Sequence, residues 1–380
     1  MNAKKSLTNK TVDSMKKYLF FLAAALLTAC SNDDGNIEQQ EQPSQKIGFT
    51  TLAQKATRGE NSDATNTAGL EAYHQNFLVW GYKTIIDTPA TVFEGTQVTF
   101  QAPENEGDEG TWTYSPARYW DKSASGYNFY AAAPYSTEWK WNETTNKFAY
   151  ADFAVTGATL APSATVNNAA VFTTDTDLMI SDDISNHTDY TGNPVNFKFN
   201  HILSRINIGV AKGTALESDN VQLLGITLYN MKKNGSFDES LSSGEALQNG
   251  TSARWTDASA PEKFVEGVGY NTQTAVTTSL NYIYQALCIP QIAGYVPCRL
   301  DGKDLTSDAD AYLNVQYTIN GEKYNHFYNL ADIFNGNSDT DLSFNEGWQY
   351  TLKMTINPTL IQFDAEVYEW AEKSASAFDI

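Results

Sequence analysis

Histidine, cysteine and basic side chains are scarce in this sequence, and their scarcity excludes several classes of function. The 380 residues include four histidines and three cysteines, and 25 Lys and Arg residues stand against 45 Asp and Glu residues. The chain also lacks a glycine-rich phosphate-binding loop, the His and Cys spacing of a metal site, and a His–Glu pair on a helix. We therefore expect no enzymatic activity, no bound metal and no cofactor.

The charge balance and the composition narrow the class of protein further. A net charge of −20 and a pI near 4.5 disfavour binding to nucleic acid, whose backbone is itself negative. Aromatic residues make up 13% of the chain, Thr, Asn and Ser are plentiful, and long Ala/Leu/Glu/Lys helical patterns are missing. This composition is typical of extracellular β-structure, and the length suggests two domains.

The stretch Met15–Cys30 has the layout of a secretory signal peptide. It has a short basic start, an apolar middle and small residues at its end, and we expect the signal to begin at Met15. The apolar run is too short to span a membrane, which takes about 20 residues. Its last four residues, Leu27-Thr28-Ala29-Cys30, resemble a bacterial lipobox, which implies that residues 1–30 are a lipoprotein signal and that Cys30 is diacylated. The alternative is an ordinary cleaved signal with an incidental cysteine.

Residues 31–46 are polar and rich in Asp, Glu and Gln, so they predict a disordered acidic tether. An acidic stretch directly after a lipidated cysteine resembles the surface-export signal of Bacteroidetes lipoproteins, and a plain linker is the alternative. Residues 47–52 then alternate in hydrophobicity and predict a short strand with one mostly apolar face. The polar segment that follows carries Lys55 and Arg58, which makes it a good target for a protease.

Apolar and aromatic runs predict several strands in the N-terminal half. Phe77–Tyr82 is expected to be buried on both faces, and Ala90–Phe100 to be broken near Gly95. Trp112–Trp120 and Tyr127–Pro134 read as two aromatic strands around a turn. Their rings either fill a sandwich core, which we favour, or stack on sugars.

The loop after a short strand at Thr176–Ile180 contains four groups able to bind a metal. We interpret them as turn-forming residues, because Asp and Asn are common in turns for that reason alone. They are Asp182, Asp183, His187 and Asp189.

The segment Val195–Val210 changes its apolar face near its middle, which predicts a crossing between two domains, residues 47–199 and 200–380. His201, at this crossing, is interpreted as a hydrogen-bonded structural histidine. Ser204 is not interpreted as a catalytic serine, because no strained Gly-flanked serine is present.

Strands at Val221–Asn230 and Asn281–Pro290 are predicted in the C-terminal half, with a turn at Asn234-Gly235. Asn320-Gly321 predicts a hairpin. Two amphipathic strands close the chain, and the second has an apolar row of Ile361, Phe363, Ala365 and Val367. Cys288 and Cys298 either pair in a disulfide or remain as two buried thiols.

Taken in order, these motifs resemble the fimbrillin (Mfa-like) proteins of Bacteroides and relatives, the subunits of type V pili. Besides the lipobox, the residues that carry the resemblance are Lys55–Arg58, Trp112–Trp120, Tyr127–Pro134, Asp177–Met179, Phe199–Arg205, Ile289–Gln291 and Glu369-Trp370. The resemblance implies an all-β fold of two transthyretin-like sandwich domains in tandem. It also implies export to the outer-membrane surface as a lipoprotein, with the fimbria as the final location.

The same resemblance implies maturation by a trypsin-like protease that removes the lipid and the first strand, here Ile47, Phe49 and Leu52. Arg58 is the expected cleavage site, and Lys55 is its nearest rival. Other pilus subunits, of the same or a related kind, are the expected partners: the vacated groove would accept a strand from one of them. The row Ile361, Phe363, Ala365 and Val367 is the expected C-terminal assembly strand, with residues 371–380 as a donor tail in a stalk subunit.

Two alternatives remain open. A tip adhesin would need no donor tail, and a monomeric surface lipoprotein would bind glycans through its aromatic residues.

Overall fold

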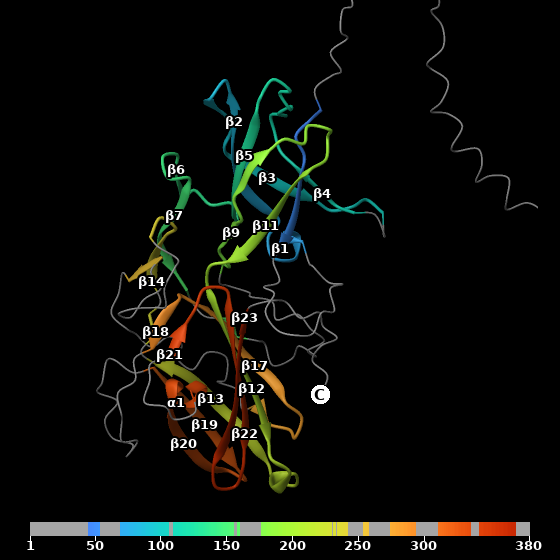
Figure 1. Ribbon diagram of the computed structural model, residues 1–380. Coiled ribbons are helices and arrows are strands. Elements are labelled where there is room, and N and C mark those ends of the chain that lie inside the picture. The colour runs from blue at the N-terminus through green and yellow to red at the C-terminus, as the bar shows by residue number, and fades with distance from the viewer. Residues whose placement is uncertain are drawn as a thin grey trace, which may run out of the picture. The chain divides into compact units, whose positions relative to one another are not determined.

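The computed structural model describes residues 45–53, 69–105, 109–155, 158–159, 176–229, 231–232, 234–241, 254–257, 274–293, 311–335 and 342–369. Strands dominate these residues (Figure 1). The α-helix α1 covers Leu330–Asn335, and two 3-10 turns, η1 and η2, cover Leu70–Ala72 and Thr214–Leu216. In the part of the chain described here, no helix is long and apolar enough to cross a membrane. The prediction of an all-β fold is confirmed.

The first sheet has the strand order β1-β11-β9-β5-β2-β3-β4, with β10 beside β5. All of its pairs are antiparallel except β1 with β11, which run parallel. Its strands are β1 (Phe49–Ala53), β2 (Asn76–Ile85), β3 (Thr88–Gln101), β4 (Thr111–Thr113), β5 (Gly126–Ala133), β9 (Met179–Ser181), β10 (Ile184–His187) and β11 (Val195–His201).

Two further sheets are built mainly from the C-terminal half. One has the order β23-β22-β12-β17-β8 and the other β16-β13-β19-β20, and β12 runs parallel to β22. Their strands are β8 (Ala158–Thr159), β12 (Ser204–Lys212), β13 (Val221–Tyr229), β16 (Thr274–Ala275), β17 (Asn281–Cys288), β19 (Tyr312–Ile319), β20 (Glu322–Asn329), β22 (Trp348–Ile356) and β23 (Ile361–Glu369).

Smaller sheets join strands that are distant in sequence. They are β15-β14-β7-β6, built from β6 (Trp139–Asn142), β7 (Lys147–Ala154), β14 (Asn234–Asp238) and β15 (Trp255–Asp257), and β18-β21, built from β18 (Gln291–Ala293) and β21 (Leu342–Phe344). The pairs β7–β14 and β8–β17 both cross the expected limit between residues 199 and 200. The two-domain division therefore stays a prediction, and strands from one side of residue 200 pair with strands from the other side.

Strand β2 packs into two hydrophobic cores, as its apolar run predicted. Phe77 and Val79 belong to one core with residues of β1, β5 and β11, whereas Leu78 and Trp80 belong to the second. The predicted burial on both faces is confirmed. The expected break near Gly95 is a bulge instead: β3 is continuous, but Gly95 has φ +58° and the register with β2 shifts there.

The change of apolar face in residues 195–210 is also confirmed. Phe197 and Phe199 of β11 point into the first core, and Ile206 and Ile208 of β12 point into the second. The chain leaves β11 at His201 and enters β12 at Ser204, so the crossing occupies two buried residues between them.

Three local predictions were wrong. Asn234-Gly235 makes no turn, because both residues lie inside β14 and pair with β7. The glycine is explained by close packing instead, since a Cβ on Gly235 would come within 2.9 Å of the Thr256 carbonyl oxygen. The first aromatic strand ends at Thr113, shortly before Pro116, which has no N–H to donate. Part of the expected loop after Ser181 forms the strand β10.

Candidate functional site

The segment from Gln45 to Ala53 is held by main-chain hydrogen bonds along two different neighbours. The Ile47 N–H donates to the Arg118 carbonyl, and the Trp120 N–H donates to the Gln45 carbonyl, both at 2.9 Å. Further along, Phe49–Ala53 pairs in parallel with Val195–Phe199 of β11. Since β1 is the end strand of its sheet, it can leave without breaking any other strand pair.

The side chains of this segment alternate as predicted. Ile47, Phe49 and Thr51 are 0%, 4% and 7% exposed, whereas Thr50 is exposed. Leu52, which we expected among the released apolar residues, lies on the opposite parity and is only partly buried. A threonine therefore takes the third buried position of the strand.

Phe49 lies at the centre of an aromatic groove, which we define as the five rings around it. Their centroids lie 5.4–6.3 Å from that of Phe49, mostly in edge-on or tilted geometry. Aromatic pairs at such distances each contribute about 0.5–1.5 kcal/mol beyond the area that they bury. The rings come from four strands and the segment after β4, and they are Phe77, Phe93, Tyr114, Phe129 and Phe197.

Polar contacts fix the two ends of the segment. The Tyr114 hydroxyl donates to the Ile47 carbonyl at 2.6 Å, and the Lys46 ammonium lies 5.0 Å from the Tyr114 ring centroid. At the other end, the Leu70 N–H donates to the Thr51 hydroxyl at 3.1 Å. The start of η1 is thereby tied to the end of β1, and the expected cleavage segment lies in the chain between them.

Release of this segment would leave two complementary vacancies: free main-chain groups on β11, and an apolar groove lined by aromatic rings. Both match what an added strand supplies, because its backbone restores the ladder and its alternate side chains fill the groove. Both vacancies are therefore of the kind that an added β-strand fills.

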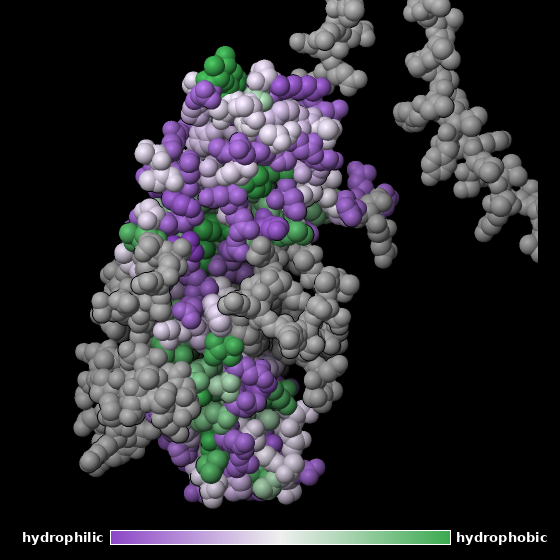
Figure 2. Space-filling view, viewed as in Figure 1, coloured by the Kyte–Doolittle hydropathy of each residue, from purple (hydrophilic) through white to green (hydrophobic). Residues whose placement is uncertain are grey.

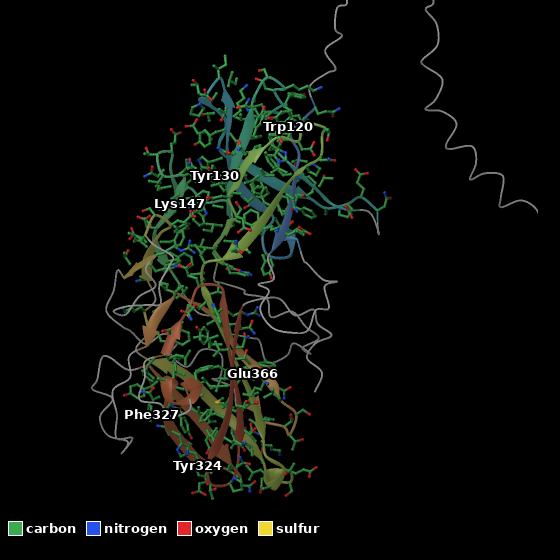
Figure 3. The ribbon with its side chains drawn as sticks, viewed as in Figure 1. Trp120, Tyr130, Lys147, Tyr324, Phe327 and Glu366 are labelled. Carbon is green, nitrogen blue, oxygen red and sulfur yellow. The ribbon has the colours of Figure 1, made fainter. Side chains whose placement is uncertain are left out.

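The second assembly element expected from the sequence, β23, is the end strand of another sheet and pairs with β22 in the predicted hairpin. Its apolar row is buried at the start and open at the end. Ile361 is 6% exposed, Phe363 and Ala365 are partly buried, and Val367 is 41% exposed. On the opposite face, Lys353 of β22 lies 2.6 Å from Glu366, which Figure 3 labels.

The four metal-binding candidates of the loop after β9 have separate partners. Asp182 accepts from Asn200, Asp183 lies 3.5 Å from the Lys147 ammonium, and Asp189 accepts from Thr191 and Asn193. His187 stacks on the ring of Trp120. Within the described residues, no three His, Cys, Asp or Glu side chains gather as a metal site would require.

The aromatic segments mostly fill the cores, as we favoured over sugar stacking. Trp120 and Tyr130, labelled in Figure 3, are 1% and 4% exposed, and Tyr127 and Phe129 are equally buried. Tyr119 is the exception at 57%. A buried ring has no free face to offer to a sugar.

His201 is buried and hydrogen-bonded, as predicted for a structural histidine. Its Nδ1 lies 2.7 Å from Asp177 Oδ2, and the two side chains are 2% and 5% exposed. Nearby, His74 Nε2 donates to the Asp177 carbonyl at 2.6 Å. Ser204 donates its hydroxyl to the Asn345 carbonyl, which is a structural role.

Acidification is expected to destabilise the protein through His74. Burial lowers its pKa below 6.5, against the opposing effect of Asp177 and with a smaller contribution from His201. Between the folded-state pKa and 6.5, the unfolded chain binds a proton that the folded chain does not, so stability is lost as the pH falls through this window. The free energy of unfolding should fall by up to about 1.4 kcal/mol per pH unit from this group.

Urea unfolding at pH 7.5, 6.5 and 5.5 measures this effect. His74→Gln keeps a side-chain donor near the Asp177 carbonyl but does not titrate, so it should flatten the pH dependence. An unchanged slope in that variant would assign the effect to other groups.

Several predicted residues lie outside the described part of the chain: Cys30, Lys55, Arg58, Cys298, Trp370 and the tail 371–380. Cys288 is fully buried, and burial raises the pKa of its thiol. Its pairing with Cys298 stays a prediction.

Sequence reasoning missed the parallel pairing of β1 with β11 and the ring cluster around Phe49. One feature of the sequence could have pointed to the ring cluster: Phe49 is the single aromatic residue between Cys30 and Tyr73. Alternation along a strand identifies its buried face but carries no information about which strand lies beside it.

Among the solved structures similar to this chain, we name three that are each aligned over 86% of it. A fimbrial protein of Bacteroides vulgatus is 16% identical, with 99% of its chain covered and a TM-score of 0.46. A protein of Bacteroides uniformis described as a candidate cell adhesion protein is 17% identical, with 98% covered and a TM-score of 0.46. The tip fimbrial protein Mfa3 of Porphyromonas gingivalis, truncated at its C-terminus, is 10% identical, with 100% covered and a TM-score of 0.42.

No curated protein matches the sequence. The profile of the fimbrillin-like family, in contrast, matches residues 57–370, which is most of the chain. The protein belongs to the fimbrillin-like family.

Proposed function

We propose that this protein is a structural subunit of a cell-surface fimbria, assembled by strand exchange and contributing to adhesion. It is exported as a lipoprotein on Cys30, reaches the outer-membrane surface, and is matured there by a trypsin-like protease that cuts at Arg58. The other subunits of the fimbria, of this or a related kind, are its partners. It has no catalytic role.

One observation carries this proposal: β1 is an end strand whose Phe49 fills the aromatic groove, and Ile47, just before β1, is buried in the same core. Ile47 and Phe49 each contribute about 1.5–3 kcal/mol by burial, so the empty groove is strongly unfavourable in water. A strand donated by another subunit removes that penalty, and repetition of a head-to-tail contact builds a filament. Membership of the fimbrillin-like family supports the same assembly.

Limited digestion with trypsin tests the proposal. We expect a stable core that begins at Gly59, followed by filaments visible by negative-stain electron microscopy. Removal of residues before Gly59 takes β1 out of its groove, which is the step that permits a donor strand to enter. Mass spectrometry of the core and microscopy of the same sample measure the two events separately.

Two matched variants identify the cleavage site. Arg58→Gln should abolish the Gly59 terminus and the filaments, whereas Lys55→Gln should leave both unchanged. The opposite pattern would move the site to Lys55. A correctly cut core that stays monomeric would remove the stalk assignment, in which residues 371–380 supply the donor strand, and favour a tip subunit.

A further inference from the structure

The turn that joins β2 to β3 places an isoleucine where the backbone disfavours it. Ile85 pairs with Thr88, so the loop has two residues, Ile86 and Asp87, with φ values of +47° and +62°. Positive φ at both positions is the signature of a type I′ turn, which favours Asn-Gly. A branched side chain at the first of these positions crowds its own backbone.

The same protein contains a two-residue turn of this kind with the preferred residues. Asn320 and Gly321 join β19 to β20 with φ values of +51° and +89°. The backbone requirement is therefore met in one hairpin and violated in the other. The sequence of the β2–β3 turn is not explained by the demands of folding.

Ile86 is also the most exposed of the large hydrophobic side chains described, at 91%. The neighbouring strand β5 starts opposite Thr84, and β4 pairs with β3 only at Thr99–Gln101, so the turn projects past both of them. Figure 2 shows the hydrophobic surface at this end of β2. An apolar side chain that is both strained and fully solvated stabilises nothing within its own chain.

We propose that Ile86 is an assembly contact that is buried against a second copy of this chain in the fimbria. The partner follows from how little one buried isoleucine can contribute to binding. Burying one isoleucine changes an equilibrium constant by about 10- to 100-fold, whereas a complex that stands alone buries about 1,200–2,000 Å². One turn residue cannot hold a complex, but it strengthens a contact between subunits that strand exchange already holds together.

This proposal rests on the proposed function. It predicts that one substitution stabilises the uncut protein but weakens filament formation. Ile86→Asn relieves the turn, so the unfolding equilibrium constant of the uncut protein should fall by about fivefold or more. After trypsin, the same variant should need about a tenfold higher concentration to form filaments, because the apolar contact is lost. Chemical unfolding measures the first change, and sedimentation of filaments across a dilution series measures the second.

A photo-crosslinking amino acid placed at Ile86 identifies the partner directly. Irradiated filaments should yield dimers of the chain, and the same probe at Glu322, beside the other turn, should yield far fewer. Filaments of Ile86→Asn with an unchanged concentration dependence, or the absence of cross-linked dimers at Ile86, would overturn this contact while leaving strand exchange intact. A wild-type core that is cut at Gly59 but forms no filaments would remove the stalk assignment, and with it the contact proposed for Ile86, and would favour a tip subunit.

Discussion

Replacing Phe49 by alanine is expected to lower the free energy of unfolding of the uncut protein by about 3–5 kcal/mol. Phe49 is 4% exposed, and five aromatic rings surround it, so its loss leaves a cavity that rigid rings cannot collapse to fill. If β1 detaches before the rest unfolds, the measured loss is limited to the free energy of that release. Urea unfolding gives the total, and hydrogen exchange of the β11 amides shows local release.

Thr50→Ala provides the matched control. Thr50 is adjacent in the strand but exposed, and the hydrogen bond from its hydroxyl to Asn196 is long at 3.4 Å. We expect a change below about 0.5 kcal/mol. After trypsin the Phe49→Ala and wild-type cores should be identical in stability, because residue 49 has been removed. A difference between those two cores would mean that β1 is not the released strand.

The sequence predicted best those features in which each residue's own preference decides the structure. Asn320-Gly321 meets the backbone requirement of a type I′ turn, and the predicted hairpin around it is confirmed. The alternation after Tyr350 predicted the β22–β23 hairpin for the same local reason. The apolar run of β2 likewise predicted its place between two cores.

Features that depend on a distant neighbour could not be predicted. Gly235 resembles a turn glycine in sequence, yet it is needed because the main chain of β15 approaches it closely. The parallel pairs β1–β11 and β12–β22 join segments far apart in the chain, and no residue in either segment specifies its partner. The β2–β3 turn could not be predicted either, because the sequence Ile86-Asp87 is not typical of a turn.

The candidate site was predicted in part. The sequence identified Ile47 and Phe49 as one face of a short strand, and both are buried. It did not identify the groove, because the groove exists only after β2, β3, β5 and β11 bring their rings to one place. Alternation predicted four apolar positions on one face of β23, but Val367, the last of them, is 41% exposed.

Phe363→Asp is expected to destabilise the protein by about 2–4 kcal/mol, because a carboxylate would replace a ring that packs edge-on against Tyr328 at 4.6 Å. The gradient of exposure along β23 gives this prediction its controls. Asp364→Asn changes an exposed group whose distance to the Lys353 ammonium is 3.8 Å, and such surface pairs contribute about 0–1 kcal/mol. Val367→Asp, at a 41% exposed position, should cost less than half as much as Phe363→Asp.

Thermal and urea unfolding of the three variants measure the gradient, and filament formation after trypsin measures assembly. If β23 only supports its own sheet, filament loss should follow stability loss in the order Phe363, Val367, Asp364. If its exposed end contacts another subunit, Val367→Asp should block filaments while the monomer remains nearly as stable as the wild type. Equal destabilisation by Phe363→Asp and Asp364→Asn would contradict the assignment of buried and exposed faces to β23.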